Sequence, residues 1–295
     1  MNSEFQKFSD ALAAAVEKAA ESVVSVDARH HVSASGIVWS ADGEVLTADH
    51  VLQRDDQIGV TLPGGKTVSA KILGRDPASD LALLKLDATG LIVPELVETG
   101  VKVGHLVFAV GRPEGVEATL GSVVSLGGAV RTRRRRFSAY IQTDVTMYPG
   151  FSGGPLVDAS GRVLGLNSSG LVRGASLAIP VPAARAVADA LRRDGHVKHG
   201  YLGIGTQPVE LTEALAQKLD QRTGLMIISV EKDSPAEKGR LLQGDVLVEL
   251  DGQAITDIYD LQGALGPEVV DKAISAKVVR GGAIQELTVT PGVRA

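Results

Sequence analysis

Residues 148–156 read Tyr148-Pro149-Gly150-Phe151-Ser152-Gly153-Gly154-Pro155-Leu156, a single serine set among three glycines. Glycines allow a tight turn and let a substrate carbonyl come close to bare backbone N–H groups. A serine in this setting can act as a nucleophile, while the N–H groups of Gly150 and Ser152 point at the oxygen that becomes negative. Taken alone, the stretch is equally typical of a glycine-rich turn. Whether Ser152 is a nucleophile or part of a simple turn therefore depends on whether the rest of the chain contains the partner residues of a catalytic site.

A histidine and an aspartate precede this serine in positions that suit a catalytic triad. His50 follows Thr47-Ala48-Asp49 at the end of a predicted strand, and Asp80 directly precedes the apolar run 81–84. Each has a plainer interpretation, a structural histidine and a polar residue at a strand edge. The chain order His50, Asp80, Ser152 is that of the chymotrypsin class and differs from the order in α/β-hydrolases and subtilisins.

The chemistry of serine attack needs all three side chains. A serine hydroxyl is a poor nucleophile until a neutral imidazole takes its proton. The imidazole in turn needs one fixed tautomer and a partner that stabilises the imidazolium, and a buried aspartate on the other ring nitrogen provides both. The three residues together thus predict nucleophilic catalysis.

Composition limits the other possibilities. The chain has 295 residues, 44% of them hydrophobic and 3% aromatic, so it can build two or three aliphatic cores. A net charge of -5 argues against a general nucleic-acid binder. The absence of cysteine excludes disulfides and thiolate chemistry and leaves the redox compartment undetermined. No apolar run approaches the ~20 residues of a membrane span, and residues 1–22 do not resemble a signal peptide.

Short β-type runs dominate residues 21–181, after a helix predicted over 2–20 from the spacing of Phe5, Phe8, Leu12 and Val16. We predict strands near 23–28, 34–39, 44–47, 57–62, 67–74, 81–86, 105–110, 118–126, 138–143, 155–158, 162–168 and 175–180. A dozen short strands at this spacing indicate barrels or a sandwich, and the length favours two barrels. An amphipathic helix over 182–193 lies in a segment, 182–199, that we interpret as a linker.

Residues 200–295 form a separate predicted module, a small α+β domain. Strands are expected at 202–207, 225–230, 246–250, 275–280 and 284–290, with helices near 211–219 and 257–265.

The motifs together resemble the HtrA/Deg family of serine proteases. Those that fall in family order are Ser35-Gly36-Ile37, Thr47-Ala48-Asp49-His50-Val51, Asp80-Leu81-Ala82-Leu83-Leu84-Lys85, Gln142-Thr143-Asp144, Gly150-Phe151-Ser152-Gly153-Gly154-Pro155-Leu156 and Ala178-Ile179-Pro180. The resemblance runs from about residue 21 to the end. It implies a mainly β fold, in which a chymotrypsin-like double β-barrel protease domain is followed by one small PDZ domain. It also places the triad on His50, Asp80 and Ser152 and the oxyanion hole on Gly150 and Ser152.

Two further sites follow from the resemblance. The specificity pocket is expected at Leu166, Asn167 and Leu177, where the absence of an acid favours small or medium aliphatic residues over Lys or Arg. Tyr201, Leu202, Gly203 and Ile204 resemble the loop with which PDZ domains capture a peptide C-terminus through backbone N–H groups.

The chain departs from the family pattern at three places. Phe151 stands where the family usually has Asn, which leaves the resting shape of the oxyanion loop open. The connection over residues 29–33 is very short, so the long regulatory loop of some members is absent. The run 131–136, Arg-Thr-Arg-Arg-Arg-Arg, is either a solvated loop or a sensor that touches the PDZ domain or an acidic partner.

These features predict an ATP-independent serine endopeptidase that degrades unfolded or damaged proteins. No cofactor or metal is expected, because no His, Cys, Asp or Glu cluster has ligand spacing. The resemblance also implies a homotrimer and a periplasmic or otherwise extracytoplasmic location, with a cytoplasmic one left open. The alternative is a non-catalytic chaperone or peptide-binding scaffold that retains the protease fold.

Overall fold

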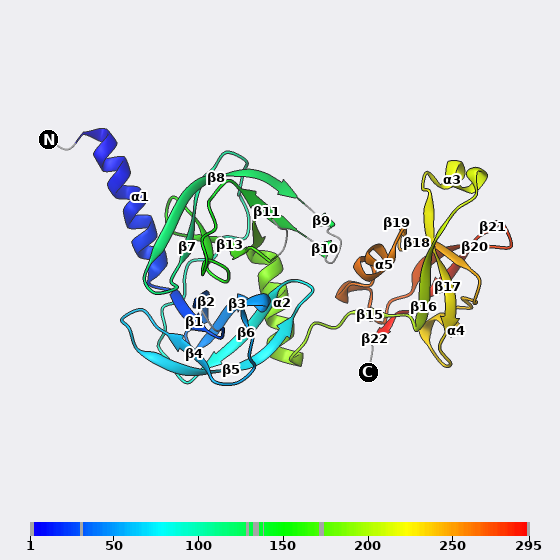
Figure 1. The fold of residues 1–295 in the computed structure, drawn as a ribbon, viewed down its shortest axis with the longest axis horizontal. Helices are drawn as coiled ribbons and strands as arrows, with labels where there is room; N and C mark the ends of the chain where they lie inside the picture. The colour runs from blue at the N-terminus through cyan, green and yellow to red at the C-terminus, as the bar shows by residue number, and fades with distance from the viewer. Residues whose placement is uncertain are drawn as a thin grey trace. The chain divides into compact units, whose positions relative to one another are not determined.

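The computed structural model describes residues 3–29, 32–127, 130–131, 136–137, 139–170 and 174–293 (Figure 1). The chain divides into two compact units, Met1–Val197 and Lys198–Ala295. Their architecture confirms the predicted fold class, with two six-stranded closed barrels in the first unit and a small α+β domain in the second.

The first barrel closes in the order β1-β2-β3-β6-β5-β4, with every neighbouring pair antiparallel. Side chains of β2, β3 and β6 are buried almost throughout, which matches their near-continuous apolar sequence. The strands are β1 (Val23–Asp27), β2 (Ala34–Ser40), β3 (Glu44–Ala48), β4 (Ile58–Thr61), β5 (Thr67–Asp76) and β6 (Leu81–Leu86). All six predicted strands of this barrel are therefore confirmed, within two residues at each end.

The second barrel closes in the order β11-β14-β13-β12-β7-β8. Its strands are β7 (Leu106–Gly111), β8 (Glu117–Gly127), β11 (Tyr140–Thr143), β12 (Pro155–Asp158), β13 (Val163–Ser168) and β14 (Ser176–Pro180). Between β8 and β11, the short strands β9 (Val130–Arg131) and β10 (Arg136–Phe137) pair antiparallel. The predicted sensor run 131–136 begins on β9 and ends on β10, and its residues 132–135 lie outside the described part of the chain.

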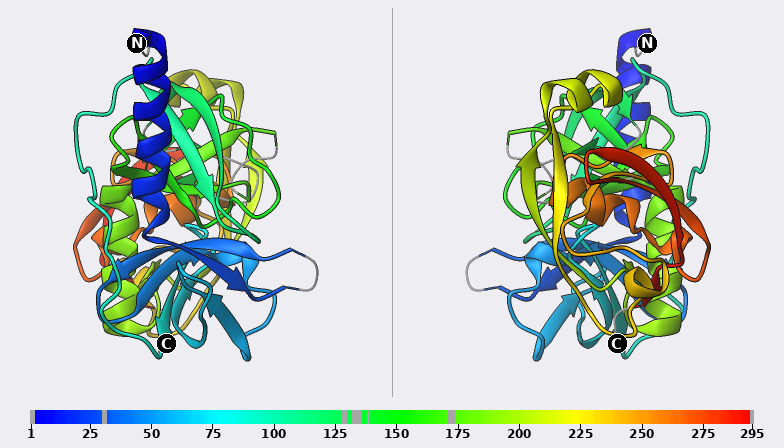
Figure 2. Two further views of the ribbon diagram at one scale, coloured as in Figure 1. Left: turned by 90° about the vertical axis from the view of Figure 1, so that its left-hand side faces the viewer. Right: turned by 90° about the vertical axis from the view of Figure 1, so that its right-hand side faces the viewer.

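Helix α1 (Glu4–Ala20) begins after Ser3, whose side chain accepts a hydrogen bond from the N–H of Gln6. Its C-terminal half packs on β7 and β12 through Ala15 and Ala19, while its N-terminal half extends past the barrels (Figures 1 and 2). Phe5 and Phe8 are 78% and 51% exposed. The predicted apolar stripe is therefore only partly covered within this chain.

Helix α2 (Val181–Asp194) packs against β5, β6, β13 and β14, so it belongs to the first unit. It ends at Gly195, which adopts a left-handed φ of 76°. Arg192 forms a two-pronged ion pair with Glu44, with nitrogen–oxygen distances of 2.8 and 2.6 Å. The hydrogen bonds from Arg192 hold the pKa of Glu44 below its ordinary value.

The second unit contains a sheet in the order β16-β17-β18-β20-β21, with β19 paired to β18. These strands are β16 (Ile204–Glu210), β17 (Thr223–Val230), β18 (Val246–Leu250), β19 (Gln253–Ala254), β20 (Ile274–Arg280) and β21 (Ala283–Val289). The helices are α3 (Glu213–Leu219), α4 (Pro235–Lys238) and α5 (Ile258–Ala264). A separate pair joins β15 (Gly200–Tyr201) to β22 (Gly292–Val293). No helix in the described residues is long and apolar enough to cross a membrane.

Candidate active site

His50 and Asp80 meet at the edge of the first barrel. Nδ1 of His50 lies 2.8 and 3.0 Å from the two carboxylate oxygens of Asp80, and the backbone N–H of His50 donates to the same carboxylate over 3.0 Å. Asp80 is completely buried, whereas 26% of the His50 side chain is exposed. The imidazole is therefore fixed through one ring nitrogen, which leaves the other nitrogen for a further partner.

The turn that precedes β6 aims the Asp80 carboxylate. Asp80 adopts a left-handed φ of 60°, which aspartate tolerates better than most residues. The carboxylate of Asp76, four residues earlier, accepts the N–H groups of Ala78 and Ser79 and so stabilises the turn. Asp76 thus shapes the loop, while Asp80 contacts the histidine.

Arg75 anchors the turn that carries His50. Its guanidinium donates to the Asp49 carboxylate over 2.6 Å, to the Asp55 carboxylate over 2.6 Å, and to the carbonyls of Asp49 and Leu52. Burial alone would lower the pKa of Arg75, but the hydrogen bonds and charges of the two aspartates outweigh it, and the pKa is raised. Arg75 therefore stays charged and holds the 49–52 turn.

Residues 168–170, at the end of β13, contact all three members of the predicted triad. The hydroxyl of Ser168 donates to the Asp80 carboxylate. The Oγ of Ser169 lies 2.9 Å from the Oγ of Ser152, and the Ser169 N–H also donates to that atom. A Cβ added to Gly170 would lie 2.6 Å from Nδ1 of His50. One segment thus brings the predicted nucleophile, base and carboxylate into the same site.

The hydrogen bonds of the Ser152 hydroxyl within the described residues go to Ser169 and not to His50. The nucleophile–base contact that the sequence predicts is therefore not formed in this state. Catalytic hydrogen bonds are often loose before substrate binds.

The loop around Ser152 consists of two consecutive turns. The Phe151 N–H donates to the Tyr148 carbonyl over 3.1 Å, and Gly150, the third residue of that turn, has a φ of 99°. The Gly154 N–H donates to the Phe151 carbonyl over 3.0 Å, with a φ of 88° at Gly153. In the first turn, proline in second place and glycine with positive φ in third place are typical of a type II turn.

These turns leave two N–H groups free of protein acceptors. Within the described residues, neither the N–H of Gly150 nor that of Ser152 donates a hydrogen bond. A Cβ on Gly153 would lie 2.0 Å from the Ser35 carbonyl oxygen, so only glycine fits there. The backbone accordingly offers two donors where the sequence predicts an oxyanion hole.

Phe151, the departure from the family pattern, is buried in the core of the second barrel. Its side chain is 1% exposed and meets the Tyr148 ring edge-on, with ring centroids 5.9 Å apart. Full burial of such a side chain contributes about 1.5–3 kcal/mol. The oxyanion loop is therefore anchored by apolar packing.

The predicted specificity residues lie next to this loop on paired strands. Leu166 and Asn167 lie on β13, and Leu177 lies opposite Ser168 on β14. All three are buried, and the two leucines pack in the large core cluster of the first unit. The side-chain amide of Asn167 donates to the Pro155 carbonyl over 2.7 Å. In this structure the three side chains are therefore part of the packed interior.

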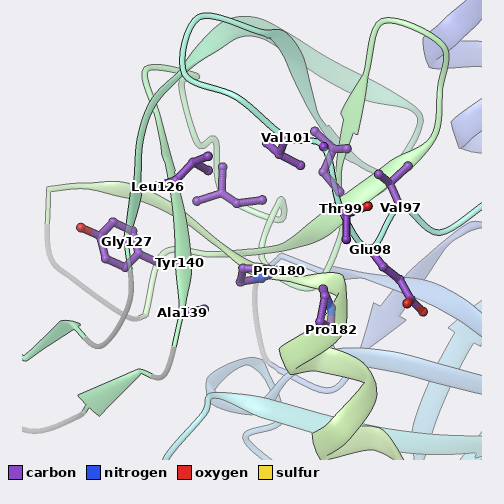
Figure 3. Close-up of a pocket in the computed structure, with 13 residues that line it drawn as sticks. Val97, Glu98, Thr99, Val101, Leu126, Gly127, Ala139, Tyr140, Pro180 and Pro182 are labelled. Carbon is purple, nitrogen blue, oxygen red and sulfur yellow. The ribbon is translucent and has the colours of Figure 1, made fainter.

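A cavity of about 220 Å³ lies elsewhere in the first unit, and no triad residue lines it (Figure 3). It is surrounded by the 97–101 segment, the end of β8, the start of β11, the end of β14 and the start of α2. Leu126, Tyr140 and Pro180 contribute apolar walls. No group of three metal-binding side chains was found within the described residues.

The predicted peptide-capture loop joins β15 to β16 in the second unit. Gly203 has a φ of 77°, and its carbonyl accepts the Glu231 N–H, while the Leu202 carbonyl accepts the Ala236 N–H. The N–H groups of Leu202 and Gly203 have no acceptor in the described part of the chain. Tyr201 donates its hydroxyl to Glu231. The loop thus presents free backbone donors beside β16, against which α5 packs.

Several contacts of the site were not predicted from the sequence. Ser35, Ser168 and Ser169 contact the triad or its loop, and Arg75 anchors the histidine turn. Ser35 lies in a motif and Ser168 at the end of a predicted strand, but nothing local indicates which group a serine hydroxyl contacts across the fold.

Comparisons with known proteins identify the families of the two units. Residues 34–166 match the trypsin-like peptidase domain and residues 200–290 the PDZ domain. Probable periplasmic serine endoproteases, DegP-like, of Halomonas elongata and a Marinomonas species are 38% and 39% identical over 88% and 87% of this chain. The chain spans 56% of the length of each of these relatives.

Among solved structures, the HtrA-type protease AlgW with a tripeptide is 33% identical, with a TM-score of 0.76. The match covers 96% of this chain and 97% of that one. The two barrels, the succession of His50, Asp80 and Ser152, and these similarities show that the chain belongs to the HtrA family of serine proteases.

Proposed function

We propose that this protein is an ATP-independent serine endopeptidase that cleaves unfolded or damaged polypeptides, with His50, Asp80 and Ser152 as its triad. The observation that carries the proposal is the convergence of the three side chains on residues 168–170. Membership of the HtrA family supports the reaction class.

The proposed reaction begins with proton transfer from the Ser152 hydroxyl to Nε2 of His50. The Ser152 oxygen then attacks the peptide carbonyl carbon, and the N–H groups of Gly150 and Ser152 bind the oxyanion. The imidazolium, stabilised by Asp80, returns its proton to the leaving amine as the C–N bond breaks. Water then attacks the acyl-enzyme with His50 as base, releasing the new carboxylate and the free serine.

The proposed specificity is for small or medium aliphatic residues before the scissile bond. Leu166 and Leu177 supply apolar walls, and neither segment 166–168 nor 176–178 contains an acid that would bind Lys or Arg. Profiling with a peptide library checks this assignment, and a dominance of Lys or Arg at that position would overturn it.

The second unit is proposed to capture peptide C-termini. The free N–H groups of Leu202 and Gly203 are suitable donors to a terminal carboxylate, and Tyr201 and Ile204 flank them. The solved AlgW structures with a decapeptide and a tripeptide belong to proteins 30% and 33% identical to this one. Isothermal titration with an apolar peptide and its C-terminal amide tests the assignment, since only the free carboxylate should bind.

We further propose that the protein assembles as a homotrimer and acts outside the cytoplasm. The exposed Phe5 and Phe8 on α1 supply apolar surface for assembly. The names of the DegP-like relatives support a periplasmic location. Fractionation of cells that express the full-length protein checks the location.

The deciding experiment is cleavage of unfolded casein by the wild type and by Ser152→Ala. Loss of cleavage in Ser152→Ala, with unchanged melting temperature and peptide binding, would support the endopeptidase. A wild-type protein that prevents aggregation of unfolded protein but cleaves nothing would favour the chaperone alternative. The observation in favour of that alternative is that Ser152 bonds to Ser169 and not to His50 in the described residues.

A further inference from the structure

Ser35, on β2 of the first barrel, holds the oxyanion loop by two of its atoms. Its hydroxyl donates to the Gly150 carbonyl over 2.7 Å, and its backbone N–H donates to the Ser152 carbonyl over 3.1 Å. The two carbonyls belong to the two residues whose N–H groups form the proposed oxyanion hole. Ser35 therefore fixes the loop beside both donors.

The hydroxyl of Ser35 is itself held from the other side. The backbone N–H of Arg112 donates to its Oγ over 2.8 Å, so the hydroxyl accepts one hydrogen bond and donates another. Thr47 donates its hydroxyl to the Ser35 carbonyl over 2.7 Å. Ser35 is completely buried, so no water competes for these groups. Its single rotatable hydroxyl is thus directed at Gly150.

Arg112 ties this contact to α1. Its guanidinium donates to the carbonyls of Ala20 and Val23 over 2.7 Å each. The backbone of Arg112 is thereby fixed relative to the end of α1 and the start of β1. A continuous chain of hydrogen bonds runs from the end of α1 through Arg112 and Ser35 to Gly150.

We propose that Ser35 is a positioning residue for the oxyanion hole, which acts by holding the Gly150 carbonyl so that the neighbouring N–H groups face the reacting oxygen. The inference rests on the proposed function. A hydrogen bond to the Gly150 carbonyl restricts rotation of the Gly150–Phe151 peptide plane, which lies between the two planes that carry the Gly150 and Ser152 N–H groups. Oxyanion stabilisation depends on donors fixed in advance. The hydroxyl of Ser35 does not touch the substrate.

The test compares Ser35→Ala with Ser22→Ala, a matched control. Ser22 is also a buried serine, and its hydroxyl also donates to a backbone carbonyl, that of Ala19 over 2.9 Å, but it does not contact the oxyanion loop. For Ser35→Ala we expect kcat on a reporter peptide to fall about 10- to 100-fold with little change in KM, because donor alignment matters only in the transition state. Ser22→Ala should keep the wild-type kcat.

Inhibitor binding separates positioning from general damage. A peptide trifluoromethyl ketone, which adds to a serine as a tetrahedral oxyanion, should lose affinity for Ser35→Ala in proportion to kcat. The C-terminal amide of the same peptide, which carries no charge at that carbonyl and adds no oxyanion, should bind as it does to the wild type. Equal loss of affinity for both ligands, or a kcat within twofold of Ser22→Ala, would overturn the proposal.

Ser35→Cys serves if Ser35→Ala does not fold. The thiol fills the site but is a weak donor, so the same split between kcat and KM is expected. An unchanged kcat in folded Ser35→Cys would overturn the proposal. Wild-type turnover that Ser152→Ala abolishes establishes the proposed function independently. If the wild type is active and the Ser35 variant has the same kcat, the role of Ser35 is overturned while the proposed function stands.

Discussion

The Oγ atoms of Ser169 and Ser152 lie 2.9 Å apart, and this contact occupies the hydroxyl that the proposed reaction needs at His50. The Ser169 N–H adds a second, longer hydrogen bond of 3.3 Å to the same oxygen. Ser169, which contacts the proposed nucleophile, is thus next to Ser168, which bonds to Asp80.

Removal of the Ser169 hydroxyl should increase the basal rate. A side-chain hydrogen bond contributes about 0.5–1.5 kcal/mol net, so Ser169→Ala should cleave a short reporter peptide roughly twofold to tenfold faster than the wild type. Initial rates and the rate of labelling by a fluorophosphonate measure this. Ser168→Ala, which removes a bond to Asp80 instead, should be slower than the wild type. A Ser169→Ala rate at or below that of the wild type would show that the contact does not restrain the nucleophile.

Gly170 should not tolerate a side chain. A Cβ there would meet the His50 ring at 2.6 Å, so Gly170→Ala must displace either the imidazole or the 168–170 segment. A misplacement of about 1 Å in a catalytic group costs about 100-fold in rate, and kcat/KM should fall by that order. Gly115→Ala is the control, because a Cβ at Gly115 meets nothing within 4 Å. Wild-type kcat/KM in Gly170→Ala would contradict the packing of this segment on His50.

The stability of the second unit should depend on Asp245 at low pH. Burial alone would raise the pKa of Asp245, but hydrogen bonds from Arg280 and the Leu242 N–H outweigh it, and the pKa is lowered. A lowered folded-state pKa stabilises the fold above the unfolded value of about 3.9, and that contribution is lost as the pH falls through the folded-state pKa.

Asp245→Asn should therefore destabilise the second unit by about 3 kcal/mol at pH 7, because it leaves the Arg280 charge without its partner. The difference from the wild type should shrink below about pH 4. Hydrogen exchange of the β18 and β20 amides across this pH range measures both effects. Glu249→Gln, at a more exposed pair with Lys277, should cost much less, because water screens an exposed ion pair. A difference that stayed constant down to pH 2 would refute the assignment.

The N-terminal half of α1 should control assembly. Phe5 and Phe8 are largely exposed, so replacing both by Ser removes apolar surface without opening the core of this chain. Light scattering should give three times the chain mass for the wild type and a smaller species for the double variant. Lys7→Ser, on the same exposed part of the helix, should leave the mass unchanged. A wild type that is monomeric at micromolar concentration would rule the trimer out.

The sequence predicted the features that depend on local pattern. The strands of both barrels, the helix end at Gly195 and the order of the chymotrypsin class follow from apolar periodicity, glycine positions and motif succession. The contacts of Ser35 and Ser169 could not be predicted, because they join residues 115 and 17 positions apart whose hydroxyls have no periodic signal. The pairing of β15 with β22 was missed for the same reason, since two residues per strand carry no alternation.

Phe151 combines one feature that local sequence indicates with one that depends on the fold. Large aromatic side chains are usually buried, and the structure buries this one. Which core it enters depends on the two turns at Gly150 and Gly153, which aim it into the second barrel. The sequence thus indicates that such a side chain is buried, but it does not indicate which core the side chain enters.

Peptide binding to the second unit should change the cleavage rate at the first unit. A peptide can shift the active population only through different affinities for the resting and active states, and a coupling of about 1–3 kcal/mol corresponds to roughly 5- to 150-fold in activity. The state in which Ser152 contacts Ser169 is one whose population a bound peptide could lower. A saturating peptide with a free apolar C-terminus should therefore raise the cleavage rate of a short reporter, whereas its C-terminal amide should not.

Gly203→Val, whose Cβ would lie 2.4 Å from the Ser234 Cβ, should abolish the response without changing any residue of the first unit. Equal reporter rates with and without the peptide would mean that the second unit only tethers substrate, because binding there would then favour neither state of Ser152.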